Sequence, residues 1–102
     1  MRIIAKSSLR RFWEFAGKTD AQGLLESWHE TVLKATWRTP QELKAQFTNA
    51  SSCGHNRVVF NIGGNKYRLV VEVQYAKQTV WVKFVGTPAE CDAIDVERVN
   101  VD

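Results

Sequence analysis

The chain contains little cysteine and little histidine, with two of each in 102 residues. Cys53 and Cys91 are too few for the disulfide framework of a small secreted domain. Neither has another cysteine or a histidine at the spacing of zinc ligands. Both are therefore expected to be free thiols, and no metal site is predicted.

Long apolar runs are also missing. No run approaches the ~18 to 20 residues that a membrane-spanning helix needs. The opening MRIIAKSSLRR lacks the apolar stretch and cleavage site of a secretory signal. We expect a cytoplasmic protein without a membrane partner.

The composition is that of an ordinary globular protein, with 44% hydrophobic and 25% charged residues. This length supports one hydrophobic core, so residues 1–102 are predicted to form a single domain. The net charge of +3 and the pI near 9.1 permit a polyanionic partner without requiring one. The placement of the cations therefore matters more than their number.

Apolar spacing predicts two helices after a short strand at 2–5. In the first helix, Ser7 or Ser8 would be the cap and Gly17 the stop. Its apolar stripe comprises Leu9, Phe12, Trp13 and Ala16. The second helix would begin with a capping box of Thr19 and Gln22. Its stripe comprises Leu25, Trp28, Val32 and Ala35.

Capping chemistry predicts a third, short helix at 40–47. Thr39 is suited to the N-cap, Pro40 to the first helical position and Glu42 to the reciprocal bond. The polar stretch 48–55 reads as a loop, and residues 89–94 as a final helical turn. The tail 95–102 carries no strong signal.

The segment NRVVFNIGGNKYRLVV, residues 56–71, reads as a β-hairpin. A two-residue turn at Gly63-Gly64 would pair Phe60 with Tyr67. Alternation then places six apolar side chains on one face and four polar ones on the other. The polar set comprises Arg57, Asn61, Lys66 and Arg68. Cations beside an amide are suited to binding phosphate.

A third strand at 79–85 extends this sheet. A turn at 76–77 would pair Val73 with Val80 and Leu69 with Phe84. In that register Lys83 lies opposite Val70 and adds a fourth cation to the polar face. The predicted class is α+β, with helices packed on a three-stranded antiparallel meander.

Four segments, IIAKSSLRRFWE, TPQELKAQF, NRVVFNIGGNKYRLVV and KFVGTPAECD, together resemble the HigB toxins of type II toxin-antitoxin systems, within the RelE-like superfamily. The resemblance implies a RelE-like fold, with a short N-terminal strand and two helices packed on an antiparallel sheet. It implies a ribosome-dependent endoribonuclease that cuts translated mRNA without a metal or other cofactor. It also implies a HigA-type helix-turn-helix antitoxin, through which alone the operator DNA would be contacted.

Under this resemblance Arg68 matches the arginine of the family's YRLV motif and would stabilise the phosphorane. Lys66 would be the second catalytic residue, adding charge or, with a lowered pKa, moving a proton. Substrate binding is assigned to Arg57, Asn61 and Lys83.

The family's G-T-H-x-E-Y-D segment reads Gly-Thr-Pro-Ala-Glu-Cys-Asp here, so Pro88 and Cys91 replace an imidazole and a phenol. Lys66 or Glu90 could replace them in proton transfer, or the chain could be a weakened toxin. Two further alternatives remain: a relative that binds its antitoxin, RNA or ribosomes without cutting, and a gyrase poison like the ParE branch.

Overall fold

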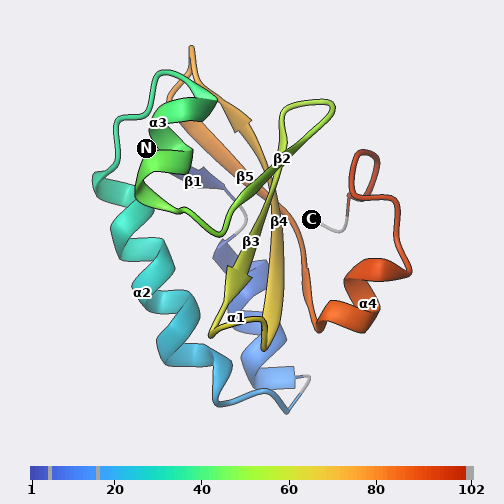
Figure 1. The fold of residues 1–102 in the computed structure, drawn as a ribbon. Coiled ribbons are helices and arrows are strands. Elements are labelled where there is room, and N and C mark those ends of the chain that lie inside the picture. The colour runs from blue at the N-terminus through green and yellow to red at the C-terminus, as the bar shows by residue number, and fades with distance from the viewer. Residues whose placement is uncertain (5, 16, 101–102) are drawn as a thin grey trace.

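The computed structural model describes residues 1–4, 6–15 and 17–100, which form a five-stranded sheet with helices on both faces (Figure 1). The elements in chain order are β1 (Arg2–Ile4), α1 (Lys6–Phe15), α2 (Ala21–Lys34), α3 (Pro40–Gln46), β2 (Ser51–Cys53), β3 (Arg57–Ile62), β4 (Tyr67–Gln74), β5 (Thr79–Gly86) and α4 (Pro88–Asp92). The strand order is β1-β5-β4-β3-β2. Only β1, among the described strands, pairs in parallel. The predicted α+β class is confirmed.

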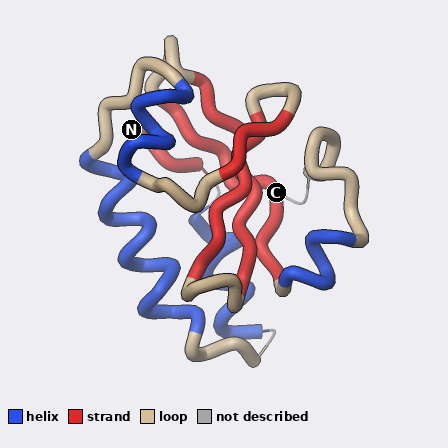
Figure 2. The backbone as a smooth tube through the Cα atoms, viewed as in Figure 1, coloured by secondary structure: helices blue, strands red, loops and turns tan. Residues whose placement is uncertain are grey.

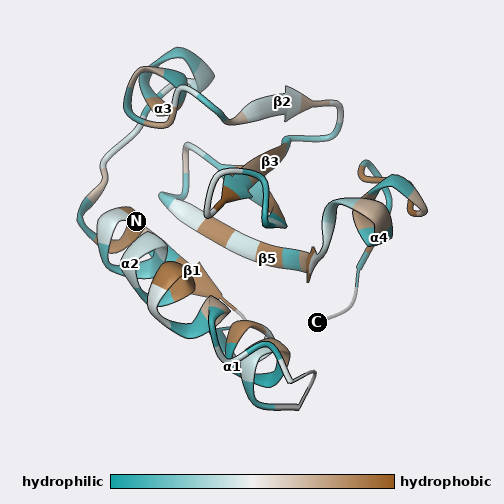
Figure 3. Ribbon diagram, turned by 60° about the horizontal axis from the view of Figure 1, so that its bottom comes forward, coloured by the Kyte–Doolittle hydropathy of each residue, from teal (hydrophilic) through white to brown (hydrophobic). Residues whose placement is uncertain are grey.

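Helices α1 and α2 lie together on one side of the sheet, and α4 lies on the other (Figure 3). The predicted stripe of α2 forms the centre of the core, with Leu25 and Val32 fully buried. Trp28 packs edge-on against Phe60 of β3, with ring centroids 5.5 Å apart. Burial of this stripe explains why α2 is helical although its N-cap is weak.

The predicted caps of α1 and α2 are wrong, although α2 begins after Asp20, close to its predicted start. Helix α1 begins at Lys6, so Ser7 and Ser8 lie inside its first turn and neither is its N-cap. The capping box of α2 does not form, and Asp20 at the N-cap makes no side-chain cap bond. Its carboxylate is instead bound to the β3–β4 loop. The parts of these predictions that fall on residues 5 and 16 lie outside the described residues.

The cap of α3 is confirmed, since the Thr39 hydroxyl accepts a hydrogen bond from the Glu42 amide at 3.3 Å. The loop predicted at 48–55 is wrong in part. Residues Ser51–Cys53 form the edge strand β2, which pairs with Arg57–Val59. The polar side chains of β2 give no apolar alternation from which a strand could be predicted. An edge strand can form backbone hydrogen bonds with its neighbour without burying an apolar face.

The β3–β4 hairpin has a register two residues away from the predicted one. Ile62 pairs with Tyr67, so the connection is the four-residue loop 63–66. Gly63, Gly64 and Asn65 all have positive φ, between 63° and 77°, which a two-residue turn could not accommodate. Because the shift is even, each side chain keeps its predicted face. Lys66, however, leaves the ladder and lies in the loop.

The register predicted between β4 and β5 is right on one side of a β-bulge and wrong on the other. The pairs Val73–Val80 and Val71–Val82 are confirmed, but the register shifts between Val70 and Val71. Beyond the bulge Phe84 pairs with Val70, so Lys83 is not opposite Val70 as predicted. The extra residue moves Val85, rather than Phe84, opposite Leu69 and onto the core face.

Candidate functional site

The sheet face turned away from α1 and α2 carries the polar side chains of β3 and β4. Asn61 pairs directly with Arg68, so their side chains leave the same face from strands about 4.8 Å apart. Figure 2 shows this face between the segment that follows α3 and the chain that follows β5. The structure therefore places two of the five predicted site residues directly opposite each other.

Arg68 is a partly exposed cation of this face, with 30% of its side chain accessible. Its Nη1 donates a 2.9 Å hydrogen bond to Oδ1 of Asp92 on α4. Its Nε is buried without a hydrogen-bond partner among the described residues. The Nε end of the guanidinium is therefore buried in the fold, while Nη1 bonds Asp92 at the surface, where the group can donate to an anion.

Gly86 lies opposite Arg68 on β5 and allows the chain to turn closely into α4. A Cβ at this position would be 2.9 Å from Oε1 of Glu90 and 2.9 Å from the Phe84 ring. Thr87 and Glu90 form a capping box, in which Oε1 of Glu90 accepts from the Thr87 amide at 2.8 Å. That backbone hydrogen bond lowers the pKa of Glu90, which is therefore a carboxylate at neutral pH.

Lys66 does not join the face, because it lies in the loop after β3. Its ammonium is paired with the Asp20 carboxylate at the start of α2. Asp20 also accepts a 2.5 Å hydrogen bond from the Tyr67 hydroxyl. The bond to Asp20 raises the pKa of Lys66, whereas proton acceptance at neutral pH would require it to be lowered.

Arg57 lies on the same face as Arg68 but is only 6% exposed. Its Nη1 donates to the backbone oxygens of Val96, at 3.3 Å, and Val99, at 2.5 Å. Its Nε is 3.7 Å from Oε1 of Glu72. The expectation of one open surface with four cations is therefore wrong, because the segment 95–100, for which the sequence carried no strong signal, folds back over Arg57.

Lys83 sits at the bulge, beside the same C-terminal segment. Its Nζ is 5.2 Å from the centroid of the Trp81 ring and 3.2 Å from Oδ1 of Asn100. A cation over an aromatic face is stabilised by the ring quadrupole. Lys83 thus belongs to the contacts that hold the C-terminal segment against the sheet.

The two residues that depart from the family motif both contribute to the fold of α4. Pro88 is the first residue of α4, where the missing N–H costs no helical bond. Cys91 is buried, with 4% of its surface exposed. Helix α4 therefore offers two carboxylates, Glu90 and Asp92, and no imidazole or phenol.

Asp20 and Asp92 were both missed in the choice of site residues. Asp92 had a signal, because it is the final residue of the G-T-P-A-E-C-D segment that resembles the family motif. Asp20 had none, because its contacts with Lys66 and Tyr67 join segments more than 40 residues apart. Such pairs exist only once the fold has formed.

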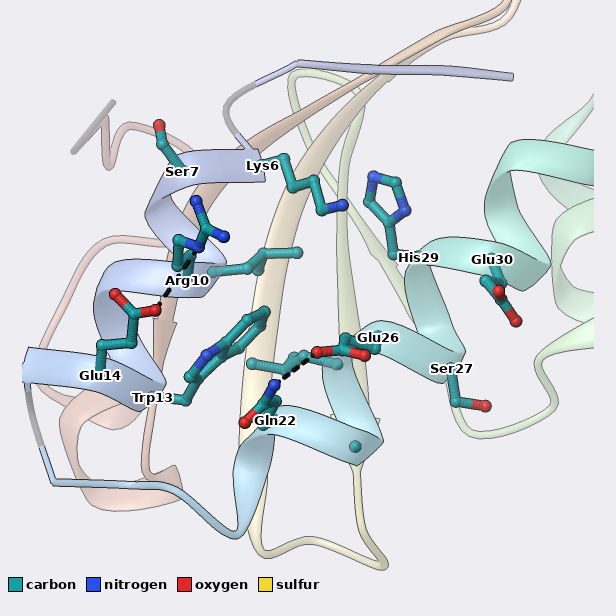
Figure 4. A pocket seen from close by; sticks show the side chains of 13 residues that line it. Lys6, Ser7, Arg10, Trp13, Glu14, Gln22, Glu26, Ser27, His29 and Glu30 are labelled. Atoms are coloured by element: carbon teal, nitrogen blue, oxygen red, sulfur yellow. Dashed lines mark hydrogen bonds and ion pairs between the residues drawn. The ribbon is translucent and has the colours of Figure 1, made fainter.

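Two of the cavities in the described part of the chain are lined by different elements. The larger, about 700 Å³, opens between α1 and α2 and is lined mainly by polar side chains, including Lys6, Glu26 and His29 (Figure 4). Burial, and then the charge of Lys6, lower the pKa of His29. None of the predicted site residues lines this cavity. The smaller, about 170 Å³, includes Asn61 in its wall.

Within residues 1–4, 6–15 and 17–100, no three His, Cys, Asp or Glu side chains are grouped so as to hold a metal ion. No helix in that part of the chain is long and apolar enough to cross a membrane.

The fold and the polar sheet face are consistent with a RelE-like toxin. Residues 21–94 match the family model of the HigB toxin, described as the RelE-like toxic component of a toxin-antitoxin system. The chain belongs to this HigB toxin family, and membership implies an antitoxin partner.

Named relatives agree with this family. The mRNA interferase HigB of Escherichia coli O6:H1 is 27% identical over 97 residues, which cover 92% of this chain and 91% of the relative. The mRNA interferase toxin HigB of Escherichia coli K12 is 33% identical over 64 residues, covering 61% of this chain and 62% of the relative. An mRNA interferase HigB from Shigella flexneri has the same identity and coverage.

Proposed function

We propose that this protein is a toxin that cleaves mRNA as an endoribonuclease, acting on translated messages at the ribosome. The observation that carries the proposal is the partly exposed Arg68 guanidinium, which already binds a carboxylate through one nitrogen. The relatives named as mRNA interferases support the choice of RNA as substrate.

Cleavage of RNA at its 2′-hydroxyl requires removal of a proton from that hydroxyl, stabilisation of the phosphorane and protonation of the 5′-oxygen. In this proposal Arg68 donates to the non-bridging phosphate oxygens, with one of them replacing Oδ1 of Asp92. Its charge is constant across the working pH range, so stabilisation does not depend on titration. Asn61, opposite Arg68, orients the same nucleotide.

The residues for proton transfer are assigned from the contacts that the candidate side chains make. The carboxylate of Glu90 can accept a proton but is held in the capping box. The ammonium of Lys66 can donate one but is paired with Asp20. We therefore assign the acceptor role to Asp92, whose side chain is 73% exposed and next to Arg68. The carboxyl group protonated in this way then returns its proton to the departing 5′-oxygen, which restores the carboxylate.

The positions of Pro88 and Cys91 favour a second candidate function. A family member that lacks both proton carriers could bind its antitoxin, and RNA or the ribosome, with little or no cleavage. The helical role of Pro88 and the burial of Cys91 support it, because neither position presents a proton donor at the surface.

One experiment separates the two functions. A defined mRNA is incubated with purified protein, with and without translating ribosomes, and new 5′ ends are mapped by primer extension. Cuts that need ribosomes and are lost in Arg68→Ala support the endoribonuclease. Absence of cuts, together with tight antitoxin binding, supports the second candidate.

The finer assignments belong to the same proposal. Residues 1–102 would act as one RelE-like domain in the cytoplasm, without a metal or other cofactor. The partner would be a HigA-type helix-turn-helix antitoxin, and operator DNA would be reached only through it. Arg57 and Lys83 would contact substrate only after the C-terminal segment moves, because both hold that segment in this structure.

A further inference from the structure

The smaller cavity opens between β3 and the segment that follows α3. Its wall includes Phe47, Asn49, Phe60 and Asn61. At about 170 Å³ it is smaller than the ~300 Å³ at which sites for drug-sized ligands begin. The volume suits one planar ring system rather than a larger molecule.

Its position relative to Arg68 follows from the strand register. Asn61 contributes to the cavity wall and pairs directly with Arg68 on the next strand. Neighbouring strands are about 4.8 Å apart, so a phosphate bound to Arg68 would lie within one nucleotide of the cavity.

The aromatic part of the wall is held rigidly. The Phe47 ring meets Phe60 edge-on at 5.0 Å and Trp37 edge-on at 5.8 Å. Nε1 of Trp37 donates in turn to Oε1 of Gln46 at 2.9 Å. A partly exposed aromatic ring fixed in this way can stack on a base at little entropic cost.

The polar part of the wall has unused hydrogen-bonding capacity. Nδ2 of Asn61 donates to the backbone oxygen of Asn49 at 3.3 Å, which fixes the orientation of its amide. Among the described residues, Oδ1 of Asn61 and the side chains of Thr48 and Asn49 make no hydrogen bond. These groups can pair with the edge of a base.

The backbone of this segment is also fixed. Nζ of Lys44 donates to the Ala50 oxygen at 2.5 Å, and the Ala50 amide donates to the Phe47 oxygen at 3.0 Å. The cavity is therefore preformed, and a ligand would not need to order it.

We propose that this cavity binds one unstacked nucleobase of an RNA strand whose phosphate lies at Arg68. This inference rests on the proposed function and extends it, because it assigns base selection to Phe47, Asn49 and Asn61. The base would stack on Phe47, and its polar edge would pair with the two amides.

The first test does not depend on cleavage. The four nucleoside 5′-monophosphates, and inorganic phosphate as the reference, are titrated into isotope-labelled protein and followed by NMR. We expect phosphate to shift the Arg68 resonances alone, and at least one nucleotide also to shift the Asn49 amide and the Phe47 ring. If Asn49 and Phe47 respond no more to the nucleotides than to phosphate, the inference is overturned.

The second test measures which bases are preferred at the cut sites. Cut sites of Phe47→Leu and Asn49→Ala are mapped against a matched control, Gln41→Ala, at an exposed position of α3 outside the cavity. We expect relative base frequencies at the cuts to change about tenfold in the first two variants and to be unchanged in the control. Unchanged frequencies in all three would overturn the inference. If the wild-type protein cuts no RNA, the proposed function fails, and the nucleotide titration still decides whether the cavity binds a base.

Discussion

Asp92 on α4 and Arg68 on β4 are joined by a 2.9 Å hydrogen bond, so a carboxylate of the protein occupies the position proposed for a substrate phosphate. The pair is open to water, with 30% of the arginine and 73% of the aspartate side chain exposed. Pairs with this exposure contribute little to stability. A polyanion can therefore displace Asp92 from Arg68 without unfolding α4.

Arg68→Ala is expected to lower ribosome-dependent cleavage by roughly 10²- to 10³-fold, because a preorganised donor to the developing oxyanion is lost. Arg68→Lys keeps the charge but loses the planar fork, so it should fall between the wild type and Arg68→Ala. Single-turnover cleavage measures the effect, and circular dichroism checks the fold. A folded Arg68→Ala variant with undiminished cleavage would remove Arg68 from the site.

Asp92→Asn is expected to have opposite effects on binding and on cleavage. Loss of the competing carboxylate should tighten binding of a non-cleavable 2′-deoxy-substituted RNA about two- to fivefold. The cleavage step should become slower, because the proposed proton acceptor is lost. Fluorescence anisotropy and single-turnover rates measure the two effects, with Asp95→Asn as the control, since Asp95 pairs with Arg98 in the tail. Weaker RNA binding by Asp92→Asn would contradict the displacement.

Arg57 is expected to contribute to the stability of the fold, independently of any role in substrate binding. Arg57→Ala leaves Glu72, which is 19% exposed, without its ion-pair partner, with only the 2.9 Å hydrogen bond from Gln74 remaining, and frees the two backbone oxygens of the tail. The expected loss is about 3 kcal/mol in the free energy of unfolding, at the low end of the range for buried pairs because Glu72 keeps some solvent. Urea denaturation measures the loss, and hydrogen exchange should increase at the Arg98 and Val99 amides, which donate to the Asp95 oxygen in the tail.

The matched control for Arg57 is Arg98→Ala, because the Arg98 side chain is 83% exposed and pairs only with Asp95 three residues earlier among the described residues. This change should be nearly neutral. If Arg57→Ala were equally neutral, the C-terminal segment would not be held by Arg57.

The contacts of Asp20 predict a dependence of stability on pH. Hydrogen bonds from Lys66, first, and from Tyr67 hold the pKa of Asp20 below its ordinary 3.8. A lowered pKa in the folded state gives stability that is present above 3.8 and is lost as pH falls through the folded value. The pKa of Lys66 is raised above 10.5, so its share is present below 10.5 and is lost as pH rises through the folded value.

The difference in Tm between the wild type and Asp20→Asn should therefore be positive at neutral pH. It should shrink both below pH 3.8 and above pH 10.5. Lys66→Met tests the other partner, and the double variant should be less destabilised than the two single effects added together. A Tm difference that stays constant from pH 3 to pH 11 would show that the pair does not couple to folding.

Pro88→His is expected to raise cleavage by about 10² or more, because it restores an imidazole where the family motif has one. The matched control is Pro40→His, since Pro40 also follows a threonine N-cap at the first position of a helix. Primer-extension rates at one cut site compare the two variants. Equal rates in both would place proton transfer elsewhere, with Asp92 or the ribosome.

Local chemistry was readable from the sequence. The threonine cap of α3, the apolar stripe of α2 and the alternating faces of β3 and β4 depend on residues a few positions apart. These patterns led to the α+β class and placed Arg68 and Asn61 on one face. The predicted register failed by two residues, yet the faces survived because an even shift preserves alternation.

The tertiary structure decided what surrounds those side chains. Lys66 is paired with Asp20, and Arg57 is covered by the backbone at Val96 and Val99. A bulge in β5 determines the position of Lys83 relative to β4. The first two relationships join residues about 40 positions apart, and the bulge adjusts one strand to its neighbour. The sequence by itself thus determined which faces of the sheet are apolar and which are polar. Only the folded chain determined which of the cations on the polar face remain open to a phosphate, because that depends on contacts between segments far apart in the chain.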